Sequence, residues 1–373
     1  MVILLFTFVL GSIVAAYIYL TKNYNYWRDR NIPCAKGTLP GFGHTLPLLV
    51  MRTTLGDLVQ RICDPYPDRS MVGFYHQTTP ALVIREPELV KTVLQTNFAS
   101  FSRNTWKIDS QLDRLNVAHP FLCYGDTWLI SRKHMGLAFT TRSLKIFLNR
   151  IQQVCINLEN YLNDKLKANN NTIELELNSL ACRYTTSVAA YTSLSVENKI
   201  REEVRTVLAK YDGQLSYYAL KEMTYIDQVI NESQRLYPIL PCMGKICTEE
   251  FELKSSDGLS CRIHPGTEIF VNVYEIHRNP KYWPNPEVFD PDRFSSERRT
   301  EIQKYTFLPF GEGPRICVAM RMAMLQTKAY LALIMKNYTL ELSSKTPKEP
   351  LKFMPGSFLL KSVSDLWVHL KPL

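Results

Sequence analysis

The sequence contains no Cys-x-x-Cys pair and no dense block of lysine and arginine. The missing pair removes the common zinc-binding spacings, and nine scattered cysteines, an odd number, fit reduced thiols in a cytosol-like compartment. Without a concentrated basic stretch, the formal charge of +9 does not indicate nucleic-acid binding and instead favours acidic partners or anionic lipid surfaces. The chain also lacks repeats. With 46% apolar residues among 373, it can bury a large hydrophobic core.

No lysine or arginine precedes the one long uncharged run, residues 2–20. Its 19 residues suffice for a helix that crosses a bilayer, and the basic residues that follow favour a cytosolic position for the rest of the chain. A cleaved signal peptide is the alternative, but such a peptide has a charged segment and a shorter apolar run. We therefore predict a transmembrane anchor over 1–21, a basic, Pro/Gly-rich linker over 22–45 and a globular domain over 46–373.

Periodicity and turn residues predict a mainly α protein with a small β-sheet formed late in the chain. Two short strands around a turn are expected over 73–84, further strands over 249–276, and a Pro-rich coil over 279–294. Residues 177–211 are helix-prone but poorly punctuated. The other expected helices cover 53–65, 86–96, 126–139 with an aspartate cap, 143–167, 225–238 and 318–338.

The segment FLPFGEGPRICVAM, residues 307–320, places turn residues and one thiol just before an apolar helix. A thiol at a helix start meets unsatisfied N–H groups, which favour the thiolate, a nucleophile or metal ligand. Haem iron is one metal that a single cysteine thiolate holds. Arg315 would suit a carboxylate such as a haem propionate, and Phe310 could pack near the macrocycle. Cys317 as a buried, inert thiol is the alternative.

Four motifs in a fixed order resemble those of the cytochrome P450 family. The loop carries Phe310-x-x-Gly313-x-Arg315-x-Cys317, which resembles the haem-thiolate motif of that family. The others are Glu232-x-x-Arg235 on a helix, Pro291-Asp292-Arg293-Phe294, and Trp128-x-x-x-Arg132. Together with the apolar N-terminus, they resemble microsomal members of the insect detoxification branch.

This resemblance implies a mainly helical triangular prism with a small sheet and one haem b. Cys317 would be the axial ligand of the haem iron, with Phe310 and Gly313 in the same loop. Trp128, Arg132, Arg315 and Lys245 would hold the propionates. Glu232, Arg235 and Arg293 would brace the structure.

The resemblance also implies the setting of the reaction. NADPH would act indirectly through a membrane NADPH–cytochrome reductase, with cytochrome b5 as a second electron donor. The substrate would be a lipophilic small molecule, such as a xenobiotic, fatty acid or steroid. The protein would sit in the endoplasmic reticulum membrane with its body facing the cytosol, and it would bind no nucleic acid.

The sequence departs from the family in three places. Ala319 stands where the haem motif usually has glycine, and Lys245 where relatives often have arginine, which changes the geometry but keeps the charge. The chain is also shorter than microsomal members, with an apparent internal deletion near 190–191. As a result, the lid helices and the acid–threonine motif of the oxygen-activating helix are missing. The nearby threonines lack the acidic neighbour of that motif; they are Thr185, Thr186 and Thr192.

Three hypotheses follow. The first is a microsomal haem-thiolate monooxygenase that inserts one atom of O2 into a lipophilic substrate. The second is an inactive or impaired truncated product, from splicing, a pseudogene or an incomplete gene model, that binds haem weakly or not at all. The third is a thiol-dependent enzyme with Cys317 as its nucleophile.

Overall fold

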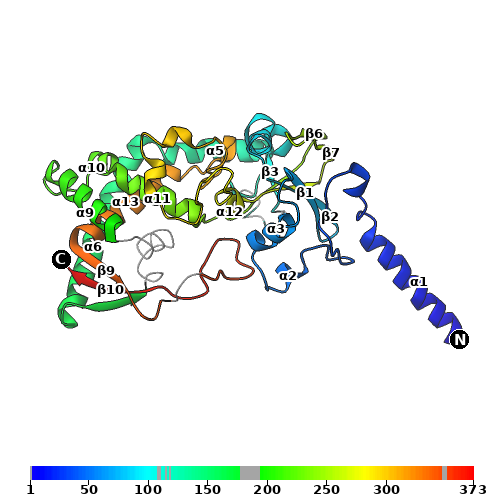
Figure 1. Ribbon diagram of the computed structural model, residues 1–373, viewed down its shortest axis with the longest axis horizontal. Coiled ribbons are helices and arrows are strands. Elements are labelled where there is room, and N and C mark those ends of the chain that lie inside the picture. The colour runs from blue at the N-terminus through cyan, green and yellow to red at the C-terminus, as the bar shows by residue number, and fades with distance from the viewer. Residues whose placement is uncertain (1, 107–110, 114–115, 117–118, 177–193, 347–350) are drawn as a thin grey trace.

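The computed structural model describes residues 2–106, 111–113, 116, 119–176, 194–346 and 351–373 (Figure 1). Its architecture is mainly α with small sheets, as the sequence predicts. The helices are α1 (Val2–Thr21), α2 (Leu46–Leu49), α3 (Leu55–Cys63), α4 (Pro87–Lys91), α5 (Gly125–Ala138), α6 (Thr141–Ala168), α9 (Leu194–Ala209), α10 (Tyr217–Glu222), α11 (Thr224–Leu236), α12 (Val273–Ile276) and α13 (Met320–Asn337). The strands are β1 (Met71–His76), β2 (Thr79–Ile84), β3 (Arg103–Asn104), β4 (Ile173–Glu176), β5 (Met243–Ile246), β6 (Phe251–Lys254), β7 (Ser260–Ile263), β8 (Glu268–Val271), β9 (Tyr338–Leu342) and β10 (Trp367–Pro372).

Helices α6, α9, α10, α11 and α13 share one hydrophobic core. α13 is deeply buried, with Leu331, Ala332 and Ile334 at most 2% exposed. Its long apolar pattern therefore reflects contact with several neighbouring helices. Figure 1 shows these helices together at the end of the body far from α1.

The main sheet has five strands in the order β1-β2-β8-β5-β3. β1 and β2 form the predicted hairpin, and β2 pairs in parallel with β8. β5 pairs antiparallel with β8 on one side and β3 on the other, which sets Asn104 opposite Lys245. Two smaller sheets, β4-β10-β9 and β6-β7, complete the fold.

The N-terminal helix α1 projects from the body, and none of its residues is buried (Figure 1). It is the one helix in the described part of the chain that is long and apolar enough to cross a membrane. The segment predicted to be a linker, 22–45, instead packs onto the sheet. Trp27 in that segment is completely buried, and its indole N–H donates to the carbonyl of Phe74 at 2.8 Å.

Several predicted elements differ in detail. Asp126 does not cap α5, which starts after Tyr124 without a side-chain cap. The stretch predicted as strand up to 276 ends in helix α12, because the Asn272 side chain accepts a hydrogen bond from the N–H of Glu275. The sheet is not confined to the late part of the chain, since β1 and β2 belong to it. The first half of the helix-prone stretch, 177–193, lies outside the described residues, as do the junction at 190–191 and the three threonines.

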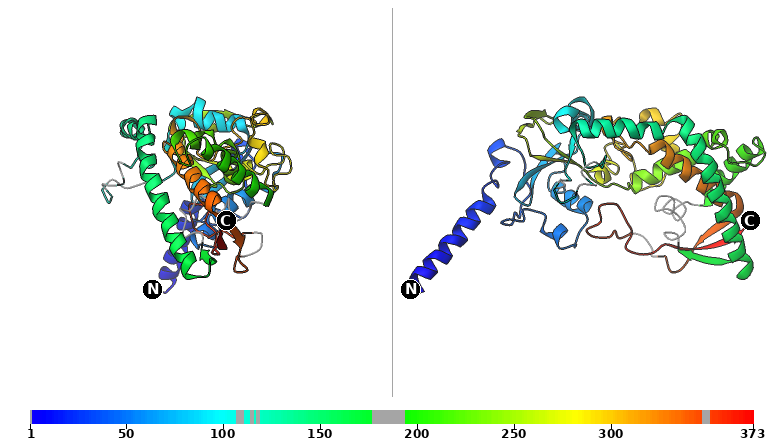
Figure 2. Two further views of the ribbon diagram at one scale, coloured as in Figure 1. Left: turned by 90° about the vertical axis from the view of Figure 1, so that its left-hand side faces the viewer. Right: turned by 180° about the vertical axis from the view of Figure 1, so that it is seen from behind.

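Helices α5 and α6 expose large apolar side chains. In Figure 2, α6 runs along one side of the body. The exposed fraction reaches 60% at Leu129 and 68% at Leu137 on α5, and 61% at Ile146 and 64% at Val154 on α6. Large apolar side chains exposed together on two neighbouring segments of a soluble domain usually contact something else.

Candidate functional site

The loop around Cys317 is held in a tight conformation that requires glycine. The N–H of Cys317 donates to the carbonyl of Phe310 at 2.9 Å. Gly313 has a φ of +72°, and a Cβ there would lie 1.9 Å from the carbonyl oxygen of Leu94, so no other residue fits without a shift. Cys317 lies just before the helix, as the sequence predicts, although α13 begins at Met320, two residues later than expected, with Ala319 at its N-cap.

The thiol of Cys317 is exposed, unlike those of the other described cysteines, none of which is in a disulfide. Buried thiols such as Cys242, whose burial raises its pKa, are inert by comparison. Among the described residues, no group of three or more His, Cys, Asp or Glu side chains could hold a metal ion. A metal at Cys317 would therefore not be held by a cluster of three or more such side chains from the described residues.

The side chain of Arg315, in the same loop, is held by two hydrogen bonds but keeps one donor free. It donates to the carbonyls of Pro120 at 3.3 Å and Cys123 at 2.7 Å, and its guanidinium lies 4.5 Å from the ring centre of Trp128. Its Nε is buried without a hydrogen-bond partner. Burial lowers the pKa of Arg315 to about 10; Cys123 opposes this shift, and the positive charge of Arg132 adds to it.

Lys245 adds a second buried cation. It is 5% exposed, and its Nζ donates to the neutral side-chain oxygen of Asn104 at 2.8 Å. Burial, and then the charge of Arg315, lower the pKa of Lys245 to about 7. A buried ammonium that faces a guanidinium without a carboxylate is costly, and such perturbed groups are common at functional sites.

The predicted propionate-binding residues thus come together. Arg315 contacts Trp128 on α5, and the charge of Arg132, also on α5, lowers the pKa of Arg315. The charge of Arg315 in turn lowers the pKa of Lys245 on β5. No carboxylate in the described ranges forms an ion pair with any of the three cations. We call Trp128, Arg132, Lys245 and Arg315 the cationic cluster. Its geometry suits a ligand that carries negative charge.

Phe310 lies at the other side of the loop. It lines a cavity of about 460 Å³ together with Met320 and Met324 of α13, and with Leu144 of α6. Sequence reasoning placed Phe310 near a macrocycle, and that placement stays a prediction.

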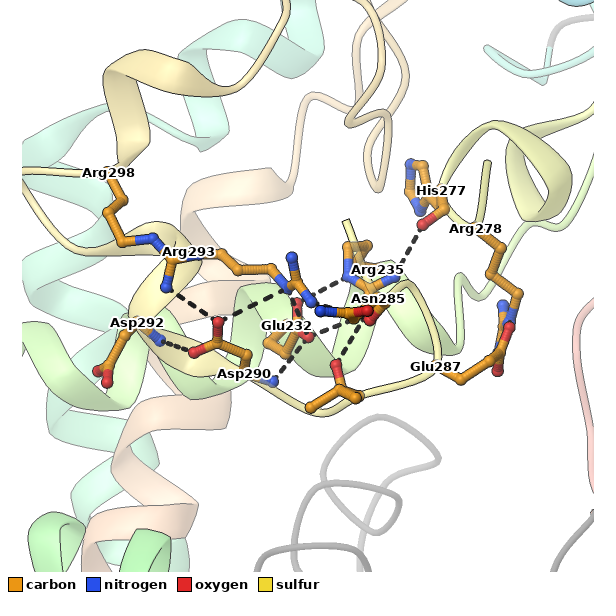
Figure 3. Close-up of polar contacts among 11 residues, drawn as sticks. Glu232, Arg235, His277, Arg278, Asn285, Glu287, Asp290, Asp292, Arg293 and Arg298 are labelled. Atoms are coloured by element: carbon orange, nitrogen blue, oxygen red, sulfur yellow. Dashed lines mark hydrogen bonds and ion pairs between the residues drawn. The ribbon is translucent and has the colours of Figure 1, made fainter. Parts of the chain in front are cut away.

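A second set of predicted residues forms a buried charge network, which Figure 3 shows. Glu232 and Arg235 are both 0% exposed on α11 and form two hydrogen bonds, of 2.8 and 2.9 Å. Arg293 lies 3.4 Å from the same carboxylate, which also accepts the N–H of Asp290 at 2.9 Å. The i, i+3 spacing on α11 places the first two side chains on one face. We call Glu232, Arg235 and Arg293 the brace.

His277 joins the brace to the Cys317 loop, and sequence reasoning missed it. Its carbonyl accepts a hydrogen bond from Arg235 at 2.8 Å (Figure 3). Its Nε2 accepts the N–H of Leu308 at 2.7 Å. Burial, together with nearby arginines, lowers the pKa of His277 to about 3, so the ring stays neutral and remains an acceptor. The only local hint was its position just after the strands expected over 249–276 and before the Pro-rich coil.

Arg103 and Asn104 were also missed. They form β3, a strand of two residues that pairs with β5. Arg103 lies with its guanidinium 4.4 Å from the ring centre of Tyr124, and its Nε is buried without a partner. No local pattern marks so short a strand.

An exposed thiol, a cationic cluster without carboxylates and a mainly helical body are together typical of a haem-thiolate protein. The family model for Cytochrome P450 matches residues 38–197 and 189–368. These two stretches cover most of the chain, so the protein belongs to the cytochrome P450 family. Membership makes it an oxidoreductase of the monooxygenase class, with haem as the cofactor of the family.

Insect proteins are among the relatives of this chain. The chain is 23% identical to cytochrome P450 6j1 of Blattella germanica over 483 aligned positions, which include 96% of this chain and 95% of the relative. It is 38% identical to the probable cytochrome P450 6a13 of Drosophila melanogaster over 176 residues, which are 47% of this chain and 34% of the relative. An alignment of 483 positions exceeds the 373 residues of this chain, so part of the relative has no counterpart here.

The residues present fit a haem. A haem carries two carboxylates and an iron, and the cluster offers an unpartnered Nε on Arg315 and a buried amine on Lys245 without an anion. Two residues after Arg315, Cys317 offers an exposed sulfur. The group would therefore supply the negative charge that the cluster lacks and accept the ligand that the loop presents.

Proposed function

We propose that the chain is a membrane-anchored haem-thiolate monooxygenase of the microsomal, insect detoxification type. The observation that carries this proposal is the cationic cluster beside the exposed thiol of Cys317. When bound, haem supplies the chemistry by which the family activates O2 and inserts one oxygen atom into a substrate. The substrate would be a lipophilic small molecule.

In this proposal, the residues of the chain bind and orient the cofactor. Cys317 would hold the iron through its thiolate, and the hydrogen bond between its N–H and the Phe310 carbonyl fixes the backbone that presents the thiol. Arg315, Arg132 and Lys245 would pair with the propionates, and the Trp128 ring packs against the Arg315 guanidinium. The brace, through His277, holds the backbone that leads into the loop.

Electrons would come from a membrane NADPH–cytochrome reductase, with cytochrome b5 as a second donor. Arg321, four residues after Cys317, donates to the hydroxyl of Thr141 at the start of α6. The exposed Arg142 and Lys145 that follow on α6 therefore lie near the loop, where a positive surface would attract an acidic partner. With α1 as the anchor, the endoplasmic reticulum membrane would carry the body on its cytosolic side.

The second candidate is a truncated product with weak or no haem binding. The exposed apolar faces of α5 and α6 favour it, because a complete domain normally covers such surfaces. The sequence offers no acid–threonine pair to deliver a proton to oxygen. The two family-model matches overlap at residues 189–197, around the proposed junction at 190–191.

Haem uptake separates the two candidates. The purified chain is reconstituted with haem, and the haem-to-protein ratio and the ferrous–carbon monoxide spectrum are measured. The first candidate predicts about one haem per chain and a thiolate-type spectrum, which Cys317→Ser abolishes while the control Cys34→Ser leaves both unchanged. A chain that takes up no haem would reject it. A Cys317→Ser variant that binds haem normally would reject the assignment of Cys317 as the ligand of the iron.

The junction has its own test. The transcript is amplified across the codons for residues 190–191 and sequenced. A longer product that encodes an acid–threonine motif would identify this chain as an incomplete form of an ordinary monooxygenase. A single product with the junction intact would favour the truncated candidate.

A further inference from the structure

A second cavity, which shares no lining residue with the cavity beside Phe310, lies between the segment after α1 and helix α3. Its volume is about 490 Å³, within the range of about 300–1,000 Å³ typical of small-molecule sites. Leu46 and Pro47 of α2 and Leu58 and Ile62 of α3 form much of its apolar wall. Nothing in the proposed monooxygenase reaction uses this cavity.

The charged side chains that line the cavity are both positive. They are Lys36 and Arg61, which are exposed and have no ion pair among the described residues, and the lining contains no carboxylate. His44 also lines it, but its ring is engaged: Nδ1 accepts the N–H of Tyr75 at 3.0 Å, and Nε2 lies 3.1 Å from the carbonyl of Ala35. An apolar wall with free cations at its edge suits an anionic amphiphile.

The cavity is tied to the end of α1. Leu20, near the last turn of α1, packs against Gly41, where a Cβ would lie 3.3 Å from the leucine side chain. The hydroxyl of Tyr24 donates to the carbonyl of Leu39 at 2.8 Å and accepts the N–H of Gly43 at 3.1 Å. If α1 crosses the bilayer, the loop over 39–43 is held at the membrane surface, where the helix leaves the bilayer.

Apolar side chains project around the same region. Five of them on the loop and on and just after α2 are between 44% and 72% exposed: Leu39, Phe42, Leu49, Val50 and Met51. In Figure 1, α2 and α1 lie on the same side of the main sheet. An exposed apolar rim beside a membrane-spanning helix is the kind of surface that enters the lipid interface.

We propose that this cavity binds an anionic phospholipid of the host bilayer. An acyl chain lies against the apolar wall, and Lys36 and Arg61 bind the phosphate and the acidic headgroup. The inference rests on the proposed membrane anchoring by α1, but it does not depend on haem binding. Bulk lipid is the occupant because the cavity is adjacent to the anchor, the rim is apolar and the charge of the lining is complementary.

The test uses the full chain in nanodiscs of phosphatidylcholine that contain a small fraction of phosphatidylserine with a photoactivatable acyl chain. After irradiation, labelled peptides are mapped by mass spectrometry. We expect the label to concentrate on residues 35–47 and 58–66. Lys36→Gln with Arg61→Gln should lower this labelling by about 25-fold, because each cation near an anionic lipid contributes about fivefold.

The matched control is Lys22→Gln with Arg28→Gln, which removes the same charge just after α1 but outside the cavity. It should leave the labelling unchanged, whereas Leu46→Trp, which fills the apolar part, should lower it without any change in charge. Equal losses in the two charge variants would overturn the inference, because they would indicate diffuse surface attraction. Equal labelling by photoactivatable phosphatidylcholine would overturn the anionic preference.

Two further outcomes distinguish the source and the anchor. Soluble glycerophosphoserine should not compete; if it competes as well as the lipid, the site binds free phosphate esters and the lipid assignment fails. Extraction of the chain from vesicles by alkaline carbonate would overturn the anchor and the inference with it. A chain that resists extraction but carries no label in the cavity would overturn the inference alone.

Discussion

The substitution Glu232→Gln should destabilise the chain more than almost any other single change. The carboxylate accepts two hydrogen bonds from Arg235 and one from the N–H of Asp290, and it lies 3.4 Å from the Nε of Arg293. Glutamine keeps the shape and one acceptor but removes the charge. Two buried guanidinium groups then share Asp290 as the nearest carboxylate of the network, at 4.0 Å from Arg293.

The expected cost is about 3–5 kcal/mol, the usual result when one partner of a buried ion pair is removed. Against a typical total stability of about 5–15 kcal/mol, this would shift the urea midpoint strongly. The assay is urea unfolding of the haem-free chain in detergent, followed by far-UV circular dichroism. The haem-free form is used so that loss of the cofactor does not contribute to the change.

The control is Glu287→Gln, in the Pro-rich segment that also carries Asp290 and Arg293. Its side chain is 76% exposed and lies 3.7 Å from Arg278, so we expect no measurable shift of the midpoint. A double variant, Glu232→Gln with Arg293→Gln, should lose less than the sum of the two single losses. A loss below about 1 kcal/mol for Glu232→Gln would refute the argument that the brace holds uncompensated buried charge.

Three further predictions use the same unfolding assay. Gly313→Ala puts a Cβ 1.9 Å from a carbonyl oxygen, so it should lower the free energy of unfolding more than the control Gly213→Ala. Gly213 also has a positive φ but open space around it, and its substitution should cost about 1–2 kcal/mol. Equal losses would refute the close approach at Gly313. The lowered pKa of Lys245 means that the folded, haem-free chain binds fewer protons than the unfolded chain between pH 7 and 10.5, so its stability should rise with pH across that window; Lys245→Met should flatten the rise, and an unchanged slope would contradict the shift. His277→Leu removes the acceptor for the N–H of Leu308 and should cost about 1–3 kcal/mol, while His277→Gln, which can supply an acceptor, should cost less; the reverse order would exclude that hydrogen bond as the cause.

The sequence predicted the parts of the site whose residues lie only a few positions apart, namely the turn before Cys317 and the Glu232–Arg235 pair. The glycine and arginine spacing around Cys317 predicted a turn that presents a thiol, and the turn forms with Gly313 at positive φ. The i, i+3 spacing of Glu232 and Arg235 predicted a pair on one helical face, and the two side chains are bonded there. In both cases, the residues that matter are a few positions apart.

Contacts between distant segments were harder to predict. Lys245 meets Asn104 because β3 pairs with β5 across 141 positions of sequence, and a strand of two residues has no periodicity to detect. The segment around Trp27 looks like a linker by composition. It packs because Gly73 leaves room: a Cβ there would lie 2.5 Å from the Trp27 ring. Such a fit between two segments is a tertiary property that neither segment shows alone.

The exposed apolar faces of α5 and α6 have a consequence for the life of the protein in the cell. Four residues of these helices are more than half exposed: Leu129, Leu137, Ile146 and Val154. Partly unfolded proteins expose apolar side chains in the same way, and chaperones retain them while proteases remove them. We therefore expect quality control, rather than catalytic rate, to limit how much of this chain accumulates. Its half-life would then report on whether anything in the cell covers these two helices.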